Sequence, residues 1–227
     1  MERHLDQELD RARQMLLRMG GMVEGMVSRA TQSLLERKSD LSAEVIRNDS
    51  DVDQLEIEID EICHSILVRR QPTAVDLRFI VAVMKINNDL ERIGDSAVNI
   101  AQSVEQLNEQ PPLKPYIDLP HLSQLVQAMV RKSLDAFVNR DAALAGEVCR
   151  SDDAVDGLYK QIFRELLTFM IEDPQTVSRA LHLLLVSRNL ERIADHATNI
   201  AEDVIYYVEG RDIRHSMGGH QQTAAQA

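Results

Sequence analysis

Apolar residues recur at three- and four-residue spacing along almost the whole chain. In one run they stand at positions 52, 55, 59, 62 and 66, and in another at 90, 93, 97, 100 and 104. This is the period of an α-helix that buries one face. No Val/Ile/Thr-rich run with strand-like alternation stands between turn residues, so strands are not expected. The pattern predicts an all-α protein with helices at roughly 4–38, 42–69, 74–108, 119–140, 143–171 and 175–209.

Proline and glycine divide this helical pattern into units. Pro111, Pro112 and Pro115 follow the third predicted helix, and each fixes φ and lacks a backbone N–H. We therefore expect a linker at 111–118 between a first unit, residues 1–110, and a second unit, residues 119–209. Residues 210–227 show no apolar period, which predicts a disordered tail.

The two predicted units share an internal repeat. A shift of 103 residues places eight residues between Arg37 and Asp53 on identical residues between Arg140 and Asp156. A shift of 100 residues does the same for ten residues between Leu90 and Val104. The change in shift falls near the second turn of each unit, where loop length changes at little cost. Each half of the chain is therefore predicted to be a copy of one three-helix unit.

Acidic residues are kept at the same positions in both copies. They form the patterns D-x-x-x-D on the second helix of each unit and E-R-I-x-D-x-x-x-N on the third. A spacing of four places two side chains on one face of a helix, where like charges repel. A freely hydrated face would exchange such residues, as Lys38 is exchanged for Asp141 elsewhere in the repeat. The retained acids are Asp49, Asp53, Glu91 and Asp95 in the first unit and Asp152, Asp156, Glu191 and Asp195 in the second.

In an antiparallel three-helix unit the third helix returns towards the start of the second. Four carboxylates per unit are then expected to converge from two neighbouring helices, and such oxygen ligands suit Mg, Mn or Fe better than Zn. The alternative is an ordinary solvated acidic face. Arg92 and Arg192 are expected either to pair with these acids across the helices or to form only weak ion pairs at the surface. His196 follows Asp195 but aligns with Ser96, so it is interpreted as a bystander.

Composition and charge narrow the classes of function. The chain has 44% hydrophobic residues, enough for a packed core, and no apolar run long enough to span a bilayer. Its charged N-terminus is unlike a signal peptide, which predicts a cytoplasmic protein. With 25 Lys and Arg against 37 Asp and Glu, the formal charge is −12. That charge disfavours direct binding to nucleic acid or to anionic lipid, so membrane association is expected only through partners.

The doubled acidic motif resembles the signature of the PhoU family. The segments ERIGDSAVNIA at 91–101 and ERIADHATNIAEDV at 191–204 carry the resemblance, which extends from about residue 4 to 209. It implies a tandem pair of three-helix bundles related by a pseudo-twofold axis. It also implies multinuclear metal clusters, one per half, held by Asp49 with Asp53, Glu91 with Asp95, Asp152 with Asp156, and Glu191 with Asp195.

The resemblance also implies a function that periodicity and charge do not indicate. It predicts a negative regulator of phosphate uptake and of the phosphate-starvation response. Such a regulator links the ATPase subunit of the phosphate ABC transporter to a membrane sensor histidine kinase. We also expect a homodimer.

Two other classes of protein would share the helical and acidic pattern. Carboxylate-bridged oxidases and iron-storage bundles need Glu-x-x-His on two helices. Glu61 and His64 form one such pair, but the repeat places Arg164 and Leu167 at the equivalent positions. A metal-free helical adaptor remains the other alternative. No H-E-x-x-H motif, nucleophile elbow or glycine-rich phosphate loop is present, so an enzyme is not expected.

Overall fold

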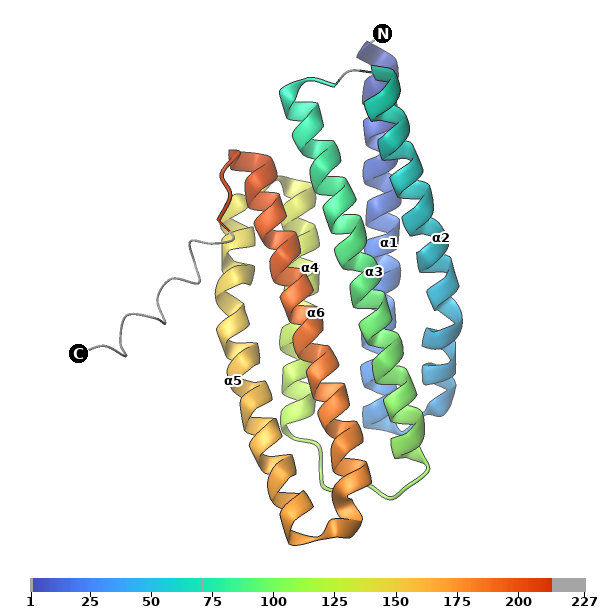
Figure 1. Ribbon diagram of the computed structural model, residues 1–227, viewed down its shortest axis with the longest axis vertical. Helices are drawn as coiled ribbons and strands as arrows, with labels where there is room; N and C mark the ends of the chain where they lie inside the picture. The colour runs from blue at the N-terminus through green and yellow to red at the C-terminus, as the bar shows by residue number, and fades with distance from the viewer. Residues whose placement is uncertain (1, 71, 214–227) are drawn as a thin grey trace, which may run out of the picture.

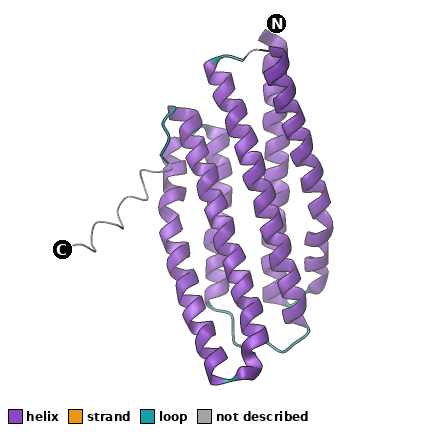
Figure 2. Cartoon of the chain, in the orientation of Figure 1, coloured by secondary structure: helices purple, strands orange, loops and turns teal. Residues whose placement is uncertain are grey.

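The computed structural model describes residues 2–70 and 72–213 (Figure 1). Within these ranges it contains α-helices, one short 3₁₀ helix and no strand (Figure 2). The elements are α1 Glu2–Glu36, α2 Ser39–Arg70, α3 Ala74–Asn108, α4 Asp118–Asn139, α5 Ala142–Glu172, η1 Pro174–Thr176 and α6 Val177–Glu209. The predicted all-α fold is confirmed.

The helices form two three-helix bundles that lie side by side. Helices α1, α2 and α3 pack on one another, as do α4, α5 and α6 (Figure 1). The two bundles meet where α3 packs on α6 and α1 packs on α4. Because third helix meets third helix and first meets first, the contacts follow the pseudo-twofold relation of the repeat. Helices α2 and α5 are the outer helices, since neither packs on the other bundle within the described residues.

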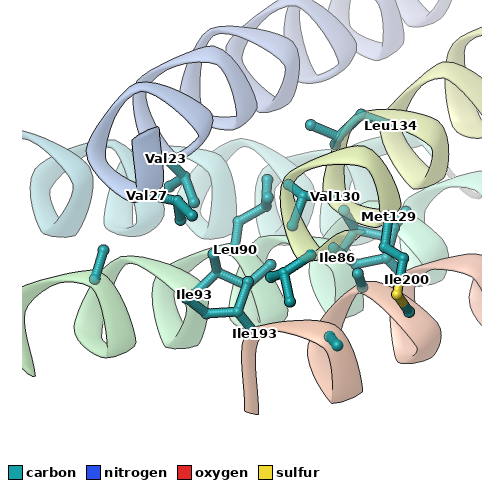
Figure 3. Packing of buried hydrophobic residues seen from close by; sticks show 14 of the residues in the cluster. Val23, Val27, Ile86, Leu90, Ile93, Met129, Val130, Leu134, Ile193 and Ile200 are labelled. Atoms are coloured by element: carbon teal, nitrogen blue, oxygen red, sulfur yellow. The ribbon is translucent and has the colours of Figure 1, made fainter. Parts of the chain in front are cut away.

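One apolar core runs through both bundles. Its buried side chains form a continuous cluster that includes residues of all six α-helices. Figure 3 shows Val23 of α1, Leu90 of α3, Met129 of α4 and Ile193 of α6 packed in the same region. Burying a large aliphatic side chain contributes about 1.5–3 kcal/mol. The interface between the bundles is therefore part of the core, which fixes the two copies relative to each other.

The helices begin and end within three residues of the predicted positions. The largest difference is at α2, which begins at Ser39 rather than at 42. Helix α1 ends at Glu36 because Arg37 takes a left-handed conformation with φ 55°, and Arg140 does the same after α4 with φ 53°. These two arginines are counterparts in the sequence repeat. Residues 175 and 176, predicted as the start of the last helix, instead belong with Pro174 to the 3₁₀ helix η1.

The segment between α3 and α4 is held by Arg37. Its guanidinium donates hydrogen bonds to the carbonyl oxygens of Leu107 at 3.3 Å, Asn108 at 2.8 Å and Gln110 at 2.6 Å. The last carbonyls of a helix have no partner within the helix, so this side chain caps α3. The turn after α1 and the start of the linker are thereby tied together.

Gly210, with φ 70°, ends α6, and the chain continues to Ile213, which is buried. The rest of the predicted tail, residues 214–227, lies outside the described residues. No helix in the described chain is both long and apolar enough to cross a membrane.

Candidate metal centre

The acids of the first bundle lie on the facing sides of α2 and α3. Asp49 and Asp53 are on α2, and Glu91 and Asp95 are on α3. Burial, and then the charges of Asp53 and Asp95, raise the pKa of Asp49. Burial and the charges of Asp95, Glu56 and Asp53 raise the pKa of Glu91, against the opposing effect of Arg92. Carboxylates on both helices therefore lie close enough for their charges to act on one another.

Glu56 extends this first group by one helical turn. Burial raises its pKa, and the charges of Asp60, Asp53 and Asp95 raise it further. Asp60 lies one more turn along α2 and accepts a hydrogen bond from the side-chain amide of Asn87 at 3.2 Å. The repeat positions of Glu56 and Asp60 in the second bundle are Tyr159 and Phe163. The acidic surface is therefore longer in the first bundle than in the second.

The acids of the second bundle lie on α5 and α6 in the equivalent arrangement. Burial, followed by the charges of Asp195 and Asp156, raises the pKa of Asp152 to about 6. Thr198 of α6 also donates a hydrogen bond to Asp152 at 3.5 Å. Burial and the charges of Asp195, Asp156 and Asp152 raise the pKa of Glu191, whereas Arg188 lowers it. Carboxylates from two helices again lie close enough for their charges to act on one another.

One carboxylate oxygen of Glu191 has no hydrogen-bond partner among the described residues. Its Oε1 accepts from Arg188 at 2.9 Å, whereas its Oε2 is buried and has no hydrogen-bond partner among the described residues. An unpartnered buried acceptor costs about 1–3 kcal/mol, and more when it is charged. A cation bound beside Glu191 would remove that cost and the repulsion from its acidic neighbours.

The carboxylates are not gathered into a complete coordination shell. Among the described residues, no group of three or more His, Cys, Asp or Glu side chains is close enough together to hold an ion as it stands. The backbones bring the acids onto facing helices, and side-chain rotation would have to bring their oxygens onto one ion. The donor set itself fits a hard cation, because each group consists of carboxylates.

Basic side chains partly neutralise both groups. Lys160 bonds Asp156 at 2.9 Å, and Arg92 bonds Glu91 at 3.3 Å on its own helix rather than across the helices. We did not expect Lys160 or Arg188 in the site. Lys160 lies four residues after Asp156, and Arg188 lies three residues before Glu191. Opposite charges at these spacings form ion pairs along a helix, so the sequence could have indicated both.

His196 acts on the acids of the second bundle through its charge, which opposes the rise in the pKa of Asp195, but its hydrogen bond goes to the other bundle. Its Nδ1 is 2.8 Å from Asp89 Oδ1, on α3 of the first bundle. Asp89 is buried and also accepts from the amide of Asn199 at 3.3 Å. The histidine therefore joins the two bundles. Sequence pattern did not identify Asp89 as its partner, because the pair has no counterpart in the repeat.

Comparison with known proteins agrees with this architecture. The PhoU domain profile matches residues 16–104 and again residues 119–204, one match in each bundle. A phosphate-specific transport system accessory protein PhoU homolog of Pseudomonas putida is 47% identical over 96% of this chain and 85% of its own length. The accessory protein PhoU of Escherichia coli strain K12 is 39% identical over 94% of this chain and 88% of its own.

Solved structures show the same fold. The crystal structure of PhoU from Pseudomonas aeruginosa has a TM-score of 0.89 and 46% identity, and covers 91% of this chain and 99% of its own. The phosphate transport system regulatory protein PhoU from Streptococcus pneumoniae has a TM-score of 0.84 and 27% identity, over 92% and 98% of the two chains. With two matched domains, two acidic groups and this likeness over most of its length, the chain belongs to the PhoU family.

Proposed function

We propose that this protein is a metal-binding accessory regulator that represses phosphate uptake and the phosphate-starvation response when phosphate is plentiful. It acts in the cytoplasm as a helical adaptor between the ATPase subunit of a phosphate ABC transporter and a sensor histidine kinase. Relatives over most of the chain are named phosphate-specific transport system accessory proteins, which supports the regulatory role. Their names describe accessories, and the role proposed here is not enzymatic.

The observation that carries the metal proposal is the duplicated group of acids. In each bundle, the charge of a carboxylate on one helix raises the pKa of a carboxylate on the neighbouring helix, as Asp95 does for Asp49 and Asp195 does for Asp152. Like charges placed together destabilise the fold unless a cation offsets them. Asp49, Asp53, Glu91 and Asp95 would hold ions in the first bundle, and Asp152, Asp156, Glu191 and Asp195 in the second. Bound cations would supply positive charge that ties α2 to α3 and α5 to α6.

The outer helices offer surfaces for the proposed partners. On α5, Phe163, Leu167 and Ile171 are 42%, 43% and 73% exposed at four-residue spacing. On α2, Ile57 and Val68 are also exposed. Apolar side chains aligned on one face of a helix are typical of contacts between proteins. We assign α2 and α5 as docking surfaces for the transporter ATPase and the kinase.

Metal analysis of the whole chain, purified without chelator, tests the metal proposal. We expect bound Fe, Mn or Mg at one or more ions per bundle. The double variant Asp53→Asn with Asp95→Asn should lose the ions of the first bundle and keep those of the second. Asp51→Asn is the matched control, since Asp51 is exposed on α2 between two of the acids. A protein that binds no ion above the level of the double variant would contradict the proposal.

The regulatory proposal needs a cellular test. In a strain that lacks its own regulator, the chain should repress a phosphate-starvation reporter in phosphate-rich medium. It should also capture the transporter ATPase and the histidine kinase in pull-downs, and removal of residues 4–209 should abolish both interactions. If repression is absent or neither protein is captured, the regulatory proposal is wrong. Light scattering would show whether the chain is the expected homodimer.

One observation favours a metal-free adaptor as the second candidate. The carboxylates do not form a ready coordination shell within the described residues. Full repression by the acid-to-amide variants would support that alternative over the metal centre. The oxidase class gains no support, because Glu61 and His64 are both exposed on α2.

A further inference from the structure

Two grooves lie along the contact between α3 and α6, and the internal repeat relates them. We name them the charged groove and the amide groove. The charged groove, about 480 Å³, is lined by residues that include Lys85, Asp89, Asn199 and Asp203. The amide groove, about 620 Å³, is lined by residues that include Asn99, Gln102, Gln106, His182, Asn189 and Arg192. A shift of 100 residues places Asn99 on Asn199 and Asp89 on Asn189, so each groove has the other as its counterpart.

The charged groove is satisfied by its own side chains. Lys85 donates to Asp203 at 2.7 Å. Asp89 pairs with His196 at 2.8 Å and accepts from Asn199 at 3.3 Å. Lys85 and Asp89 therefore both have partners across the groove. These contacts give no indication that the charged groove binds a ligand.

The amide groove lacks these contacts. Asn189 replaces the aspartate and Ser96 replaces the histidine, while Leu185 stands where the lysine would be. The hydroxyl of Ser96 donates to the carbonyl of Arg92 on its own helix at 2.9 Å. The short serine side chain is committed there and does not replace the imidazole that bridges the helices on the other side.

Two polar atoms of the amide groove are left buried without partners. Asn189 is 7% exposed, and its Nδ2 donates to the carbonyl of Leu185 at 2.8 Å. With the amide in this orientation, Oδ1 is left as an acceptor without a hydrogen bond in the described chain. Nδ1 of His182 is also buried and has no hydrogen-bond partner in the described chain. Buried polar atoms are nearly always satisfied in folded proteins, so the groove lacks a partner that supplies hydrogen bonds.

Arg192, which is exposed on α6, places a positive charge at one end of the groove, and this charge also opposes the rise in the pKa of Asp195. It makes no ion pair within the described residues, whereas its repeat counterpart Arg92 bonds Glu91. Glu105 lies at the other end of the groove, towards Gln106. Seven residues of helix separate Asn99 from Gln106, which corresponds to roughly 10 Å. The groove thus has a cationic end, a row of side-chain amides and an acidic end.

We propose that the amide groove binds a nucleoside monophosphate. The guanidinium of Arg192 takes the phosphate, since arginine bonds phosphate oxygens in pairs. A sugar hydroxyl donates to Oδ1 of Asn189 after a small rotation of that amide. The amides of Gln102 and Gln106 contact the base, and adenine suits them because amides bond its N6 and N7 in pairs. Glu105 accepts from the exocyclic amine.

The size and lining of the groove favour this ligand class over a simple anion. A volume of about 620 Å³ lies within the range of small-molecule sites. Inorganic phosphate would engage Arg192 but leave the amides and Glu105 unused. A nucleoside without phosphate would leave Arg192 unused. The proposal concerns residues other than the eight acids and does not depend on a bound metal.

Titration calorimetry of the whole chain with AMP tests the proposal. We expect AMP to bind more tightly than inorganic phosphate or adenosine. Arg192→Gln should weaken AMP binding by about tenfold or more, the effect of losing a charged hydrogen-bond donor. Arg164→Gln makes the same change of charge at an exposed position on α5 outside the groove, and should leave the affinity unchanged.

A second variant transfers the contacts of the charged groove into the amide groove. Ser96→His with Asn189→Asp should install the missing pair, abolish AMP binding and keep the helical circular dichroism spectrum. The proposal is overturned if the wild-type chain binds no AMP at millimolar concentration. It is also overturned if AMP binds no more tightly than phosphate, or if either groove variant binds it as the wild type does.

Discussion

Asp152→Asn should stabilise the metal-free protein at neutral and alkaline pH. Burial and the charges of Asp195 and Asp156 raise the pKa of Asp152 from 3.8 to about 6. The folded state therefore holds this proton more tightly than the unfolded state does. Stability contributed by the protonated group is present at low pH and is lost as pH rises through about 4 to 6. Asparagine removes the charge and can still accept the hydrogen bond from Thr198.

The size of the effect follows from the shift. About two pKa units correspond to roughly 3 kcal/mol, which is an upper bound because solvent screens a partly exposed carboxylate. We expect a gain of about 1–2 kcal/mol at pH 8, or about 2–8 °C in melting temperature for a chain of this length. At pH 4 most of the gain should disappear, because the wild-type carboxyl is then protonated in the folded state.

Urea unfolding followed by circular dichroism, with chelator present, measures this difference. Asp51→Asn serves as the control and should change stability little at either pH. Saturating Mn²⁺ should reverse the order, since the wild type gains a ligand that the variant has lost. The reasoning is refuted if Asp152→Asn is less stable than the wild type at pH 8 without metal, or if its gain is the same at pH 4.

Four further substitutions test the packing and the helix ends by thermal or urea unfolding. Gly21→Ala should stabilise the fold by about 0.5–1 kcal/mol, because alanine favours helix and the added methyl meets no atom within 4 Å. Gly20→Ala should gain less, because its methyl would lie 2.8 Å from a methyl carbon of Leu134 on α4; an equal gain would contradict this close approach. Arg37→Ala should cost about 1–3 kcal/mol through lost bonds to helix-end carbonyls, and no loss would mean that solvent replaces them. Asp141→Ala should cost about 1 kcal/mol, because Asp141 accepts from the backbone N–H groups of Ala143 and Leu144 at the start of α5; an unchanged stability would show that this cap is dispensable.

Periodicity and the repeat predict the helices and the meeting of the acids for a simple physical reason. Each bundle must bury one apolar stripe per helix, and antiparallel packing then brings the start of α2 beside the middle of α3. As a result, the charge of Asp95 on α3 raises the pKa of Asp49 on α2. These features depend on positions along helices, which sequence spacing determines.

Other features depend on conformations and contacts that spacing does not determine. Arg37 and Arg140 end two helices in a left-handed conformation. Glycine is the residue that usually signals this conformation in a sequence, and neither position has one. The pair between His196 and Asp89 depends on how the two bundles dock, and the repeat lacks it. Side-chain rotation decides whether four carboxylates share one ion, and a helical pattern places only their Cβ atoms.

The most direct test of the central claim is the number of metal ions bound by each bundle of the intact chain. Equilibrium dialysis against Mn²⁺ or Fe²⁺, followed by elemental analysis, gives this number for the wild type, for Asp53→Asn with Asp95→Asn, and for Asp156→Asn with Asp195→Asn. We predict that each double variant loses only the ions of its own bundle, and that combining them removes all bound metal. Equal and undiminished binding in all three variants, or none in the wild type, would contradict two metal centres formed by the repeated acids.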